Sequence, residues 1–148
     1  GLGANFLDEN GKENPIVMGS YGIGVERVLA CYLEQNHDDN GIVWDKSLAP
    51  FQIHLMGLNM KKDSVVEASE KLYKDLQAEG YEVLFDDRST VQAGFKFNEA
   101  DLLGMPVHII VGDKKLAENK VEIKIRKTGE RMDVSLDELS SKLKELLA

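Results

Sequence analysis

The stretch Val107-His108-Ile109-Ile110-Val111 follows turn residues at Gly104 and Pro106 and is apolar except for its histidine. A short apolar run bounded by turn residues is typical of a strand that is buried on both faces, as in the centre of a parallel sheet. Such a strand needs helices on both sides, and the segments around it are expected to supply them.

Two further strands are predicted upstream, at residues 51–58 and 81–85. Between them a helix is predicted to begin at Asp63 or Ser64 and to stop at Gly80, because glycine commonly ends helices. Ser64 has capping-box spacing with the glutamate three residues later. The apolar residues of this helix recur three or four positions apart: Val65, Ala68, Leu72 and Leu76.

A short helix that ends at Gly104 is predicted downstream of the second strand. Residues 121–134 alternate apolar and charged side chains around a polar turn, which predicts a hairpin. Ser135, again three residues before a glutamate, is predicted to open a final amphipathic helix. Strands joined through helices favour a parallel sheet centre, so we expect an α/β fold, a three-layer α/β/α domain around a mixed five-stranded sheet.

Residues 1–48 are predicted to form a separate part of the chain. Residues 1–15 are rich in turn-forming types, and Ile16-Val17-Met18 runs through a glycine-rich turn into a helical pattern. This order predicts a strand, a turn and a helix. The composition changes near residue 48, so we expect two domains, at residues 1–48 and 49–148.

The chain carries 26 acidic and 18 basic residues, a net charge of −8, which argues against nonspecific binding to nucleic acid, DNA included. From Arg88 to Arg131, however, nine basic residues face six acidic ones, a local balance of +3. This balance is compatible with a local, sequence-selective RNA contact and equally with a solvated surface. Since no apolar stretch could cross a membrane and no signal peptide is evident, we expect a soluble, cytoplasmic protein.

Metal binding is not expected. A lone cysteine, Cys31, can form neither an internal disulfide nor a multi-cysteine zinc site. His37, His54 and His108 are too scattered for a metal cluster. We expect Cys31 to be a buried thiol, and His54 and His108 to be hydrogen-bonded imidazoles in the core.

The run Asp86-Asp87-Arg88 and residues 94–106 combine the side chains that can read unpaired bases. Phe97 can stack on a base, Arg88 and Lys96 can meet phosphate or base acceptors, and carboxylates can accept hydrogen bonds from exocyclic amines. Alternatively, Phe97 belongs to the buried stripe of the short helix and the charges merely cap it. The RNA hypothesis requires Arg88 and Lys96 to share an accessible surface.

The run from Met18 to Arg27 places glycines between a predicted strand and a predicted helix. Such glycines let the backbone approach a nucleotide, and Arg27 can bind phosphate oxygens with a fork of donors. Glycine spacing alone is weak evidence, because tight strand-to-helix packing with a surface Arg27 is the commoner explanation. The dinucleotide-binding pattern fails here, since it would need a glycine at position 27.

Taken whole, this run resembles motif 3 of class II aminoacyl-tRNA synthetases, and its flanks, residues 6–12 and 34–44, are similar to those of bacterial prolyl-tRNA synthetases. The resemblance implies that residues 1–48 are the C-terminal end of a class II catalytic domain. It implies ATP-binding roles for Gly22, Gly24 and Arg27. Motifs 1 and 2 of the family are not present, so we expect no complete catalytic site and no aminoacylation by this chain alone.

The second run resembles the signature of the anticodon-binding domain shared by the prolyl, threonyl, histidyl and glycyl enzymes, and is closest to the prolyl form. This implies that residues 49–148 bind the anticodon of proline tRNA, with Arg88, Lys96 and Glu99 as the leading contacts. The wider implied set adds Asp86, Asp87, Phe97 and Asp101. Residues 89–93 depart from the family, because they lack the extra charges often present there.

The resemblance covers essentially the whole chain and implies a longer, homodimeric enzyme that joins proline to its tRNA with ATP and Mg²⁺; we expect no cofactor bound to this part. Three alternatives stay open. The chain could be an accessory or protein-interaction domain of the same fold, or the anticodon domain of a threonyl, histidyl or glycyl enzyme. It could also be an independent nucleotide-binding enzyme built on Gly22 and Gly24.

Overall fold

The computed structural model describes residues 3–147, and the chain forms two compact units, residues 1–31 and 32–148. The second unit begins earlier than the boundary predicted near residue 48. The reason is local packing. The Tyr32 ring stacks on Trp44 with 5.7 Å between ring centroids, and its hydroxyl accepts a hydrogen bond of 2.7 Å from the backbone N–H of Asp45. Trp44 in turn donates from its ring nitrogen to the Leu103 carbonyl oxygen, so residues 32–45 fold with the unit that contains the sheet.

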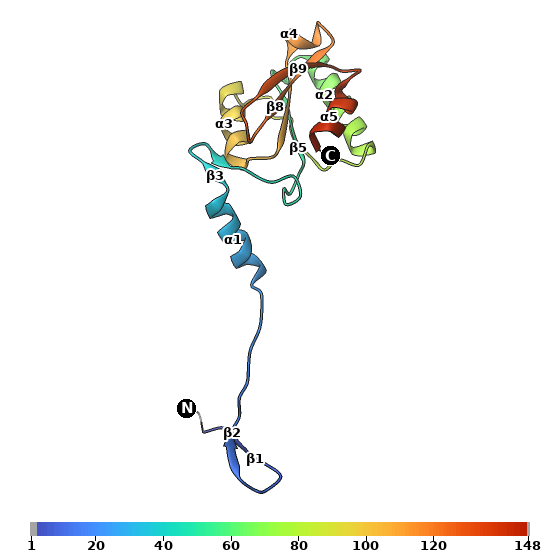
Figure 1. Cartoon of the computed structure of the whole chain (residues 1–148). Helices are drawn as coiled ribbons and strands as arrows, with labels where there is room; N and C mark the ends of the chain where they lie inside the picture. The colour runs from blue at the N-terminus through green and yellow to red at the C-terminus, as the bar shows by residue number, and fades with distance from the viewer. Residues whose placement is uncertain (1–2, 148) are drawn as a thin grey trace. The chain divides into compact units, whose positions relative to one another are not determined.

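The second unit is built around a mixed sheet of five strands (Figure 1). In spatial order these are β6 (Val83–Asp86), β5 (Ile53–Gly57), β7 (Val107–Val111), β8 (Lys120–Ile125) and β9 (Arg131–Ser135). β5 pairs in parallel with β6 and β7, whereas β8 and β9 continue the sheet with antiparallel pairing. The predicted mixed five-stranded sheet is confirmed, with the stretch from residue 107 to 111 as its central strand.

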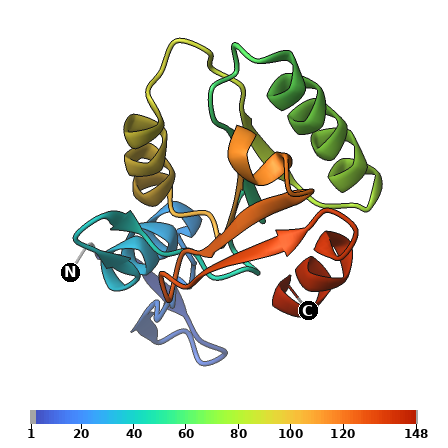
Figure 2. The same ribbon diagram turned by 90° about the horizontal axis from the view of Figure 1, so that it is seen from above.

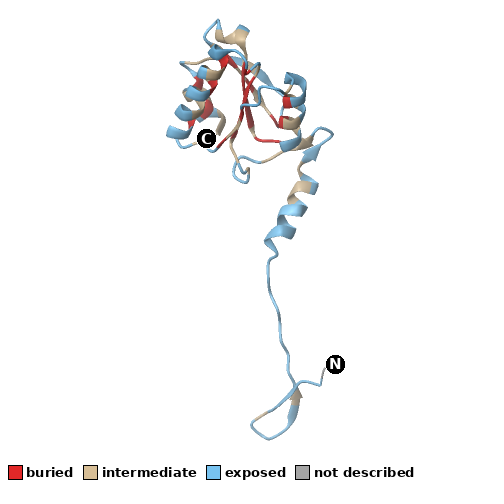
Figure 3. Ribbon diagram, turned by 180° about the vertical axis from the view of Figure 1, so that it is seen from behind, coloured by how far each residue is buried: buried red, intermediate tan, exposed pale blue. Residues whose placement is uncertain are grey.

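Helices cover both faces of this sheet (Figure 2). They are α2 (Asp63–Ala78) and α5 (Leu139–Leu147) on one face and α3 (Ala93–Leu103) on the other. Successive residues of a strand point to opposite faces of the sheet, so the core has two parts. Leu55 belongs to the larger cluster with α2 and α5, whereas Met56 packs with Ala100 of α3. Buried residues concentrate in the sheet (Figure 3). The predicted α/β/α layering is confirmed.

The local sequence signals predicted some helix ends correctly and others not. α3 ends at Gly104, whose φ of 75° is left-handed, as expected of a glycine stop. The box of Ser135 and Glu138 is half formed: the Glu138 N–H donates to Ser135 Oγ at 3.3 Å, but the Glu138 carboxylate accepts from the Ser135 hydroxyl at 2.9 Å and not from the Ser135 backbone N–H. The predicted Ser64 box is wrong, because Lys62 occupies the N-cap position of α2 and makes no side-chain capping bond.

Three short elements escaped prediction. They are α4 (Asp113–Leu116), β3 (His37–Asp38) and β4 (Gly41–Ile42). Strands β3 and β4 pair with each other as a small antiparallel hairpin. Elements of two to four residues are too short to show a hydrophobic period, so the sequence pattern gave no signal for them.

The first unit contains a small hairpin and the beginning of a helix. β1 (Asn5–Leu7) and β2 (Glu13–Pro15) pair antiparallel, and α1 (Val25–Gln35) begins after the glycine-rich segment. The strand predicted at residues 16–18 is wrong for the described chain, because the pairing with the β1 segment ends at the bond from the Ile16 N–H to the Ala4 carbonyl oxygen and no described strand continues the ladder. Cys31, expected to be buried, is exposed.

Candidate functional site

A surface pocket of about 360 Å³ lies between the carboxyl end of β6 and the side of α3. Its lining includes His54, Asp86, Asp87, Arg88, Glu99 and Leu103. Four of the seven predicted RNA-contacting residues therefore meet in one place. Ligands in open α/β sheets commonly bind at the carboxyl ends of parallel strands, and this pocket occupies such a position.

Arg88 is the cationic centre of the pocket. Its guanidinium forms a fork on Asp86, with Nε 2.9 Å from Oδ1 and one terminal nitrogen 2.7 Å from Oδ2, and the same terminal nitrogen bonds Glu99. The hydrogen bonds that Arg88 donates to Asp86 and then to Glu99 raise the pKa of Arg88. The Arg88 side chain remains 43 % exposed, so it is oriented by the carboxylates and is still accessible to a ligand.

Lys96 does not share this accessible surface, so the requirement that Arg88 and Lys96 be accessible together is not met, and any RNA contact at this pocket would have to be made by Arg88 and its neighbours without Lys96. Its side chain is 1 % exposed, and its Nζ donates to the carbonyl oxygens of Gly57 at 2.9 Å and Asp86 at 3.1 Å. Nζ also lies 3.1 Å from the Asp86 carboxylate. Parallel strands bring their carboxyl-end carbonyls to one edge, and α3 places a single lysine there to satisfy two of them.

Asp86 is also buried and acts inside the site. Burial would raise the pKa of its carboxyl group, but hydrogen bonds from Arg88 and Lys96 lower it to about 2. Asp86 is therefore ionised at neutral pH and receives both cations at once. It cannot offer a free face to RNA, so its predicted role as a contact is corrected to one of support for Arg88. Asp87, by contrast, is exposed at the rim.

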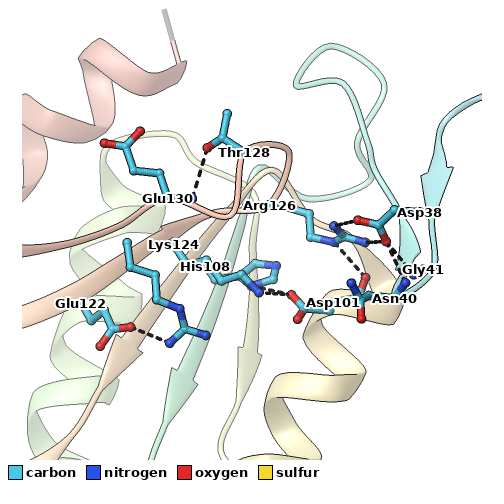
Figure 4. A network of polar contacts seen from close by, with 11 residues as sticks. Asp38, Asn40, Gly41, Asp101, His108, Glu122, Lys124, Arg126, Thr128 and Glu130 are labelled. Atoms are coloured by element: carbon cyan, nitrogen blue, oxygen red, sulfur yellow. Dashed lines mark hydrogen bonds and ion pairs between the residues drawn. The ribbon is translucent and has the colours of Figure 1, made fainter.

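Phe97 and Asp101 lie on α3 but outside the pocket lining. The Phe97 ring packs against the cluster around Met56, and the Arg131 guanidinium lies 5.7 Å from its centroid. The Asp101 carboxylate pairs with Lys124 of β8 (Figure 4). Phe97 therefore packs against the core, as the alternative interpretation of the sequence expected. Phe97 and Asp101 do not line the pocket together with Arg88.

His54 is a pocket residue that sequence reasoning missed. It lies on the α3 face of β5 opposite His108 of β7, with 5.8 Å between the ring centroids. Burial lowers the pKa of His54 to about 4 and that of His108 to about 3, so both rings are neutral at pH 7. Nδ1 of His54 and Nε2 of His108 lack hydrogen-bond partners in the described part of the chain, contrary to the expected satisfied core imidazoles. Successive residues of a strand point to opposite faces of the sheet, so the position of His54 two residues before Met56 could have placed it on the α3 face.

Gly22, Gly24 and Arg27 belong to the first unit and are exposed there. Neither glycine has a positive φ, and a Cβ added at Gly22 would meet no atom within 4 Å. The glycines are thus not required by the backbone or by packing within the described unit. Arg27 lies in the first turn of α1, and the ATP-binding role of these three residues stays a prediction.

The pocket chemistry favours base edges over phosphate. Asp87 and Glu99 supply carboxylate oxygens beside the guanidinium of Arg88, whereas the Asp86 carboxylate is occupied by Arg88 and Lys96. Carboxylates accept hydrogen bonds from amino and imino groups, and Arg88 donates to ring nitrogens or carbonyl oxygens. Within residues 3–147 no group of three or more His, Cys, Asp and Glu residues is arranged to hold a metal ion, and no helix there is long and apolar enough to cross a bilayer.

Comparison with known proteins places these features in a family. Residues 52–146 match the model of an anticodon binding domain. The chain is 54 % identical over 140 residues to a proline–tRNA ligase of Bacillus subtilis (strain 168), covering 95 % of this chain and 24 % of that protein. It is 53 % identical over 142 residues to the proline–tRNA ligase of Listeria welshimeri, covering 96 % and 25 % respectively. The chain thus spans about a quarter of the length of these relatives.

Proposed function

Because the chain belongs to the anticodon-binding domain family, we propose that its second unit binds the anticodon of proline tRNA at the pocket around Arg88. Its similarity to bacterial proline–tRNA ligases over almost its whole length supports the choice of tRNA. The arrangement that carries the proposal is the Arg88 guanidinium, oriented by Asp86 and Glu99 and still exposed at the pocket.

Selection among anticodons follows from the fixed polar groups of the pocket. A base whose donors and acceptors match Arg88, Asp87 and Glu99 replaces the water that solvates them. A wrong base leaves some of these groups unpaired, at a cost of about 1–3 kcal/mol per group. Arg88 is already oriented before RNA arrives, so little side-chain entropy is lost on binding. The negative net charge limits attraction to RNA in general, so discrimination depends on the pocket.

The chain is further proposed to be one part of a longer, cytoplasmic and homodimeric proline–tRNA ligase. That enzyme would use ATP and Mg²⁺ to activate proline. Residues 1–48 would be the C-terminal end of its catalytic domain. Gly22 and Gly24 would lie against the nucleotide, and Arg27 would bind phosphate oxygens. ATP and Mg²⁺ would supply the activation of the carboxylate, which this chain alone is not expected to perform.

The proposal is tested by binding of the purified chain to proline tRNA and to the same tRNA with an altered anticodon, at one stated salt concentration. The expected result is a measurable preference for the proline anticodon. Equal affinities for the two tRNAs would refute the anticodon role. Arg88 is the suitable position for variants in this assay, because Lys96 is buried and its substitution would also perturb the fold.

A further inference from the structure

The C-terminal end of α3 is held by donors from outside the helix. The last carbonyl groups of an α-helix have no partners within it. Here the Asp101 carbonyl oxygen accepts from Arg126 Nε at 3.0 Å, and the Leu103 carbonyl oxygen accepts from Trp44 Nε1 at 3.0 Å. The Gly104 carbonyl oxygen accepts from the Trp44 backbone N–H at 3.3 Å. Segments distant in the sequence therefore cap this helix.

Arg126 joins this end of α3 to the β3–β4 hairpin. Its terminal nitrogens bind both carboxylate oxygens of Asp38, at 2.6 and 2.7 Å, while its Nε holds the Asp101 carbonyl (Figure 4). The Asp38 carboxylate also accepts from the backbone N–H groups of Asn40 and Gly41, which shape the hairpin turn. The hydrogen bond from Arg126 lowers the pKa of Asp38, so this pair stays charged at neutral pH. Arg126 itself is 5 % exposed and is thus unavailable to RNA.

The hairpin and the helix end also touch backbone to backbone. A Cβ added at Gly41 would lie 2.3 Å from the Cα of Leu102, and one added at Gly104 would lie 1.9 Å from the carbonyl oxygen of Ile42. Close-packed backbones cannot slide past one another without breaking the hydrogen bonds described above. The axial position of α3 is therefore fixed at this end.

The pocket depends on the axial position of α3. Glu99, two residues before Asp101 on α3, bonds Arg88 from the far side of the pocket. We infer that Arg126 is a positioning residue of the proposed RNA site: it ties α3 to the hairpin of residues 37–42 and so holds Glu99 against Arg88. This role rests on the proposed function, since it concerns how selectively the pocket reads RNA.

The test compares Arg126→Lys with Arg131→Lys. The first change keeps the charge but removes the fork on Asp38 and the Nε donor. The second makes the same chemical change at Arg131, the first residue of β9, which pairs with Glu122 at 2.8 Å. In Arg126→Lys the preference for proline tRNA over its anticodon-altered form should fall by about three- to tenfold, which corresponds to roughly 0.7–1.4 kcal/mol. In Arg131→Lys it should be unchanged.

The NMR signal of the Arg88 Nε–H group distinguishes a loss of positioning from a general loss of stability. It is recorded under conditions in which each variant is fully folded. We expect this signal to shift or to exchange faster in Arg126→Lys and to stay in place in Arg131→Lys. If Arg126→Lys lowers stability but leaves both the Arg88 signal and the tRNA preference unchanged, the positioning role is refuted. Should Arg126→Lys fail to fold, Asp38→Asn, which weakens the same link and retains Arg126, is read by the same two criteria. If the unmodified chain shows no tRNA preference, the proposed function fails, and a moved Arg88 signal then shows only that Arg126 holds Glu99 against Arg88.

Discussion

The Nζ atom of Lys96 lies 3.1 Å from Oδ1 of Asp86, and the two side chains are 1 % and 6 % exposed. Asp86 in turn holds the Arg88 guanidinium with two hydrogen bonds. The orientation of the exposed arginine is thus determined by a buried ion pair beneath it. Lys96 serves the site through Asp86, and its position also joins the carboxyl ends of β5 and β6.

Lys96→Met is expected to lower the free energy of unfolding by about 1–3 kcal/mol, because it removes the donor shared by the buried Gly57 and Asp86 carbonyl oxygens and leaves the Asp86 carboxylate paired with Arg88 alone. Urea denaturation at pH 7 measures this loss. Lys74→Met is the matched control, since Lys74 is an exposed helical lysine on α2. Its substitution is expected to change stability by less than about 0.5 kcal/mol. Similar losses for the two variants would mean that Lys96 is not a buried partner of Asp86.

The two buried histidines predict a pH dependence of stability. Below the usual value of 6.5 the unfolded chain binds protons at His54 and His108, whereas the folded chain does not until pH values of about 4 and about 3. The free energy of unfolding should therefore fall as the pH drops from 6.5 to 4, by up to about 1.4 kcal/mol per pH unit for each histidine. Urea denaturation at several pH values gives the slope.

Two variants test whether the buried histidines cause this dependence of stability on pH. His108→Leu removes one of the buried imidazoles and should reduce the slope between pH 4 and 6.5. His37→Gln removes the exposed histidine of the β3–β4 hairpin and should leave the slope as it is. If His108→Leu retained the full slope, protonation of the buried pair would not be its cause.

Gly104→Ala and Gly129→Ala separate backbone strain from close contact. Both glycines have left-handed φ values, 75° and 71°, so each alanine should cost about 1–2 kcal/mol of stability. Only at Gly104 would the new Cβ also collide with the Ile42 carbonyl oxygen, whereas it would meet no atom within 4 Å at Gly129. Gly104→Ala should therefore cost about 1–3 kcal/mol more. Equal losses in urea denaturation would contradict the contact between α3 and the hairpin.

The architecture could be predicted because its signals are local. The apolar run from Val107 to Val111 predicted the central strand, and Gly104 predicted the end of α3. The strand expected at residues 16–18 failed for the opposite reason, since a strand requires a partner along its length: the Ile16 N–H bonds the Ala4 carbonyl oxygen, but no ladder in the described residues continues beside Val17 and Met18. A sequence pattern reports what a segment favours, and pairing depends on what lies beside it.

The site was predicted in part, and its errors have one cause. Asp87, Arg88 and Glu99 do meet at the pocket. Lysine is rarely buried, so its charge suggested exposure for Lys96, yet its acceptors come from residues 39 and 10 positions away. The pairing of Arg126 with Asp38 spans 88 positions and has no local signature either. Burial of a charge depends on partners that only the tertiary fold brings together.

The central claim is that Arg88 reads the anticodon, and a binding cycle tests it most directly. The affinities of the unmodified chain and of Arg88→Ala are measured for proline tRNA and for its anticodon-altered form at one salt concentration. Lys115→Ala is the control, because Lys115 likewise bridges two carboxylates, Glu122 and Asp133, but lies outside the pocket.

We expect Arg88→Ala to lose about 1–3 kcal/mol of the discrimination between the two tRNAs, and Lys115→Ala to keep it. Undiminished discrimination by Arg88→Ala would contradict the assignment of this pocket as the site where the anticodon is read.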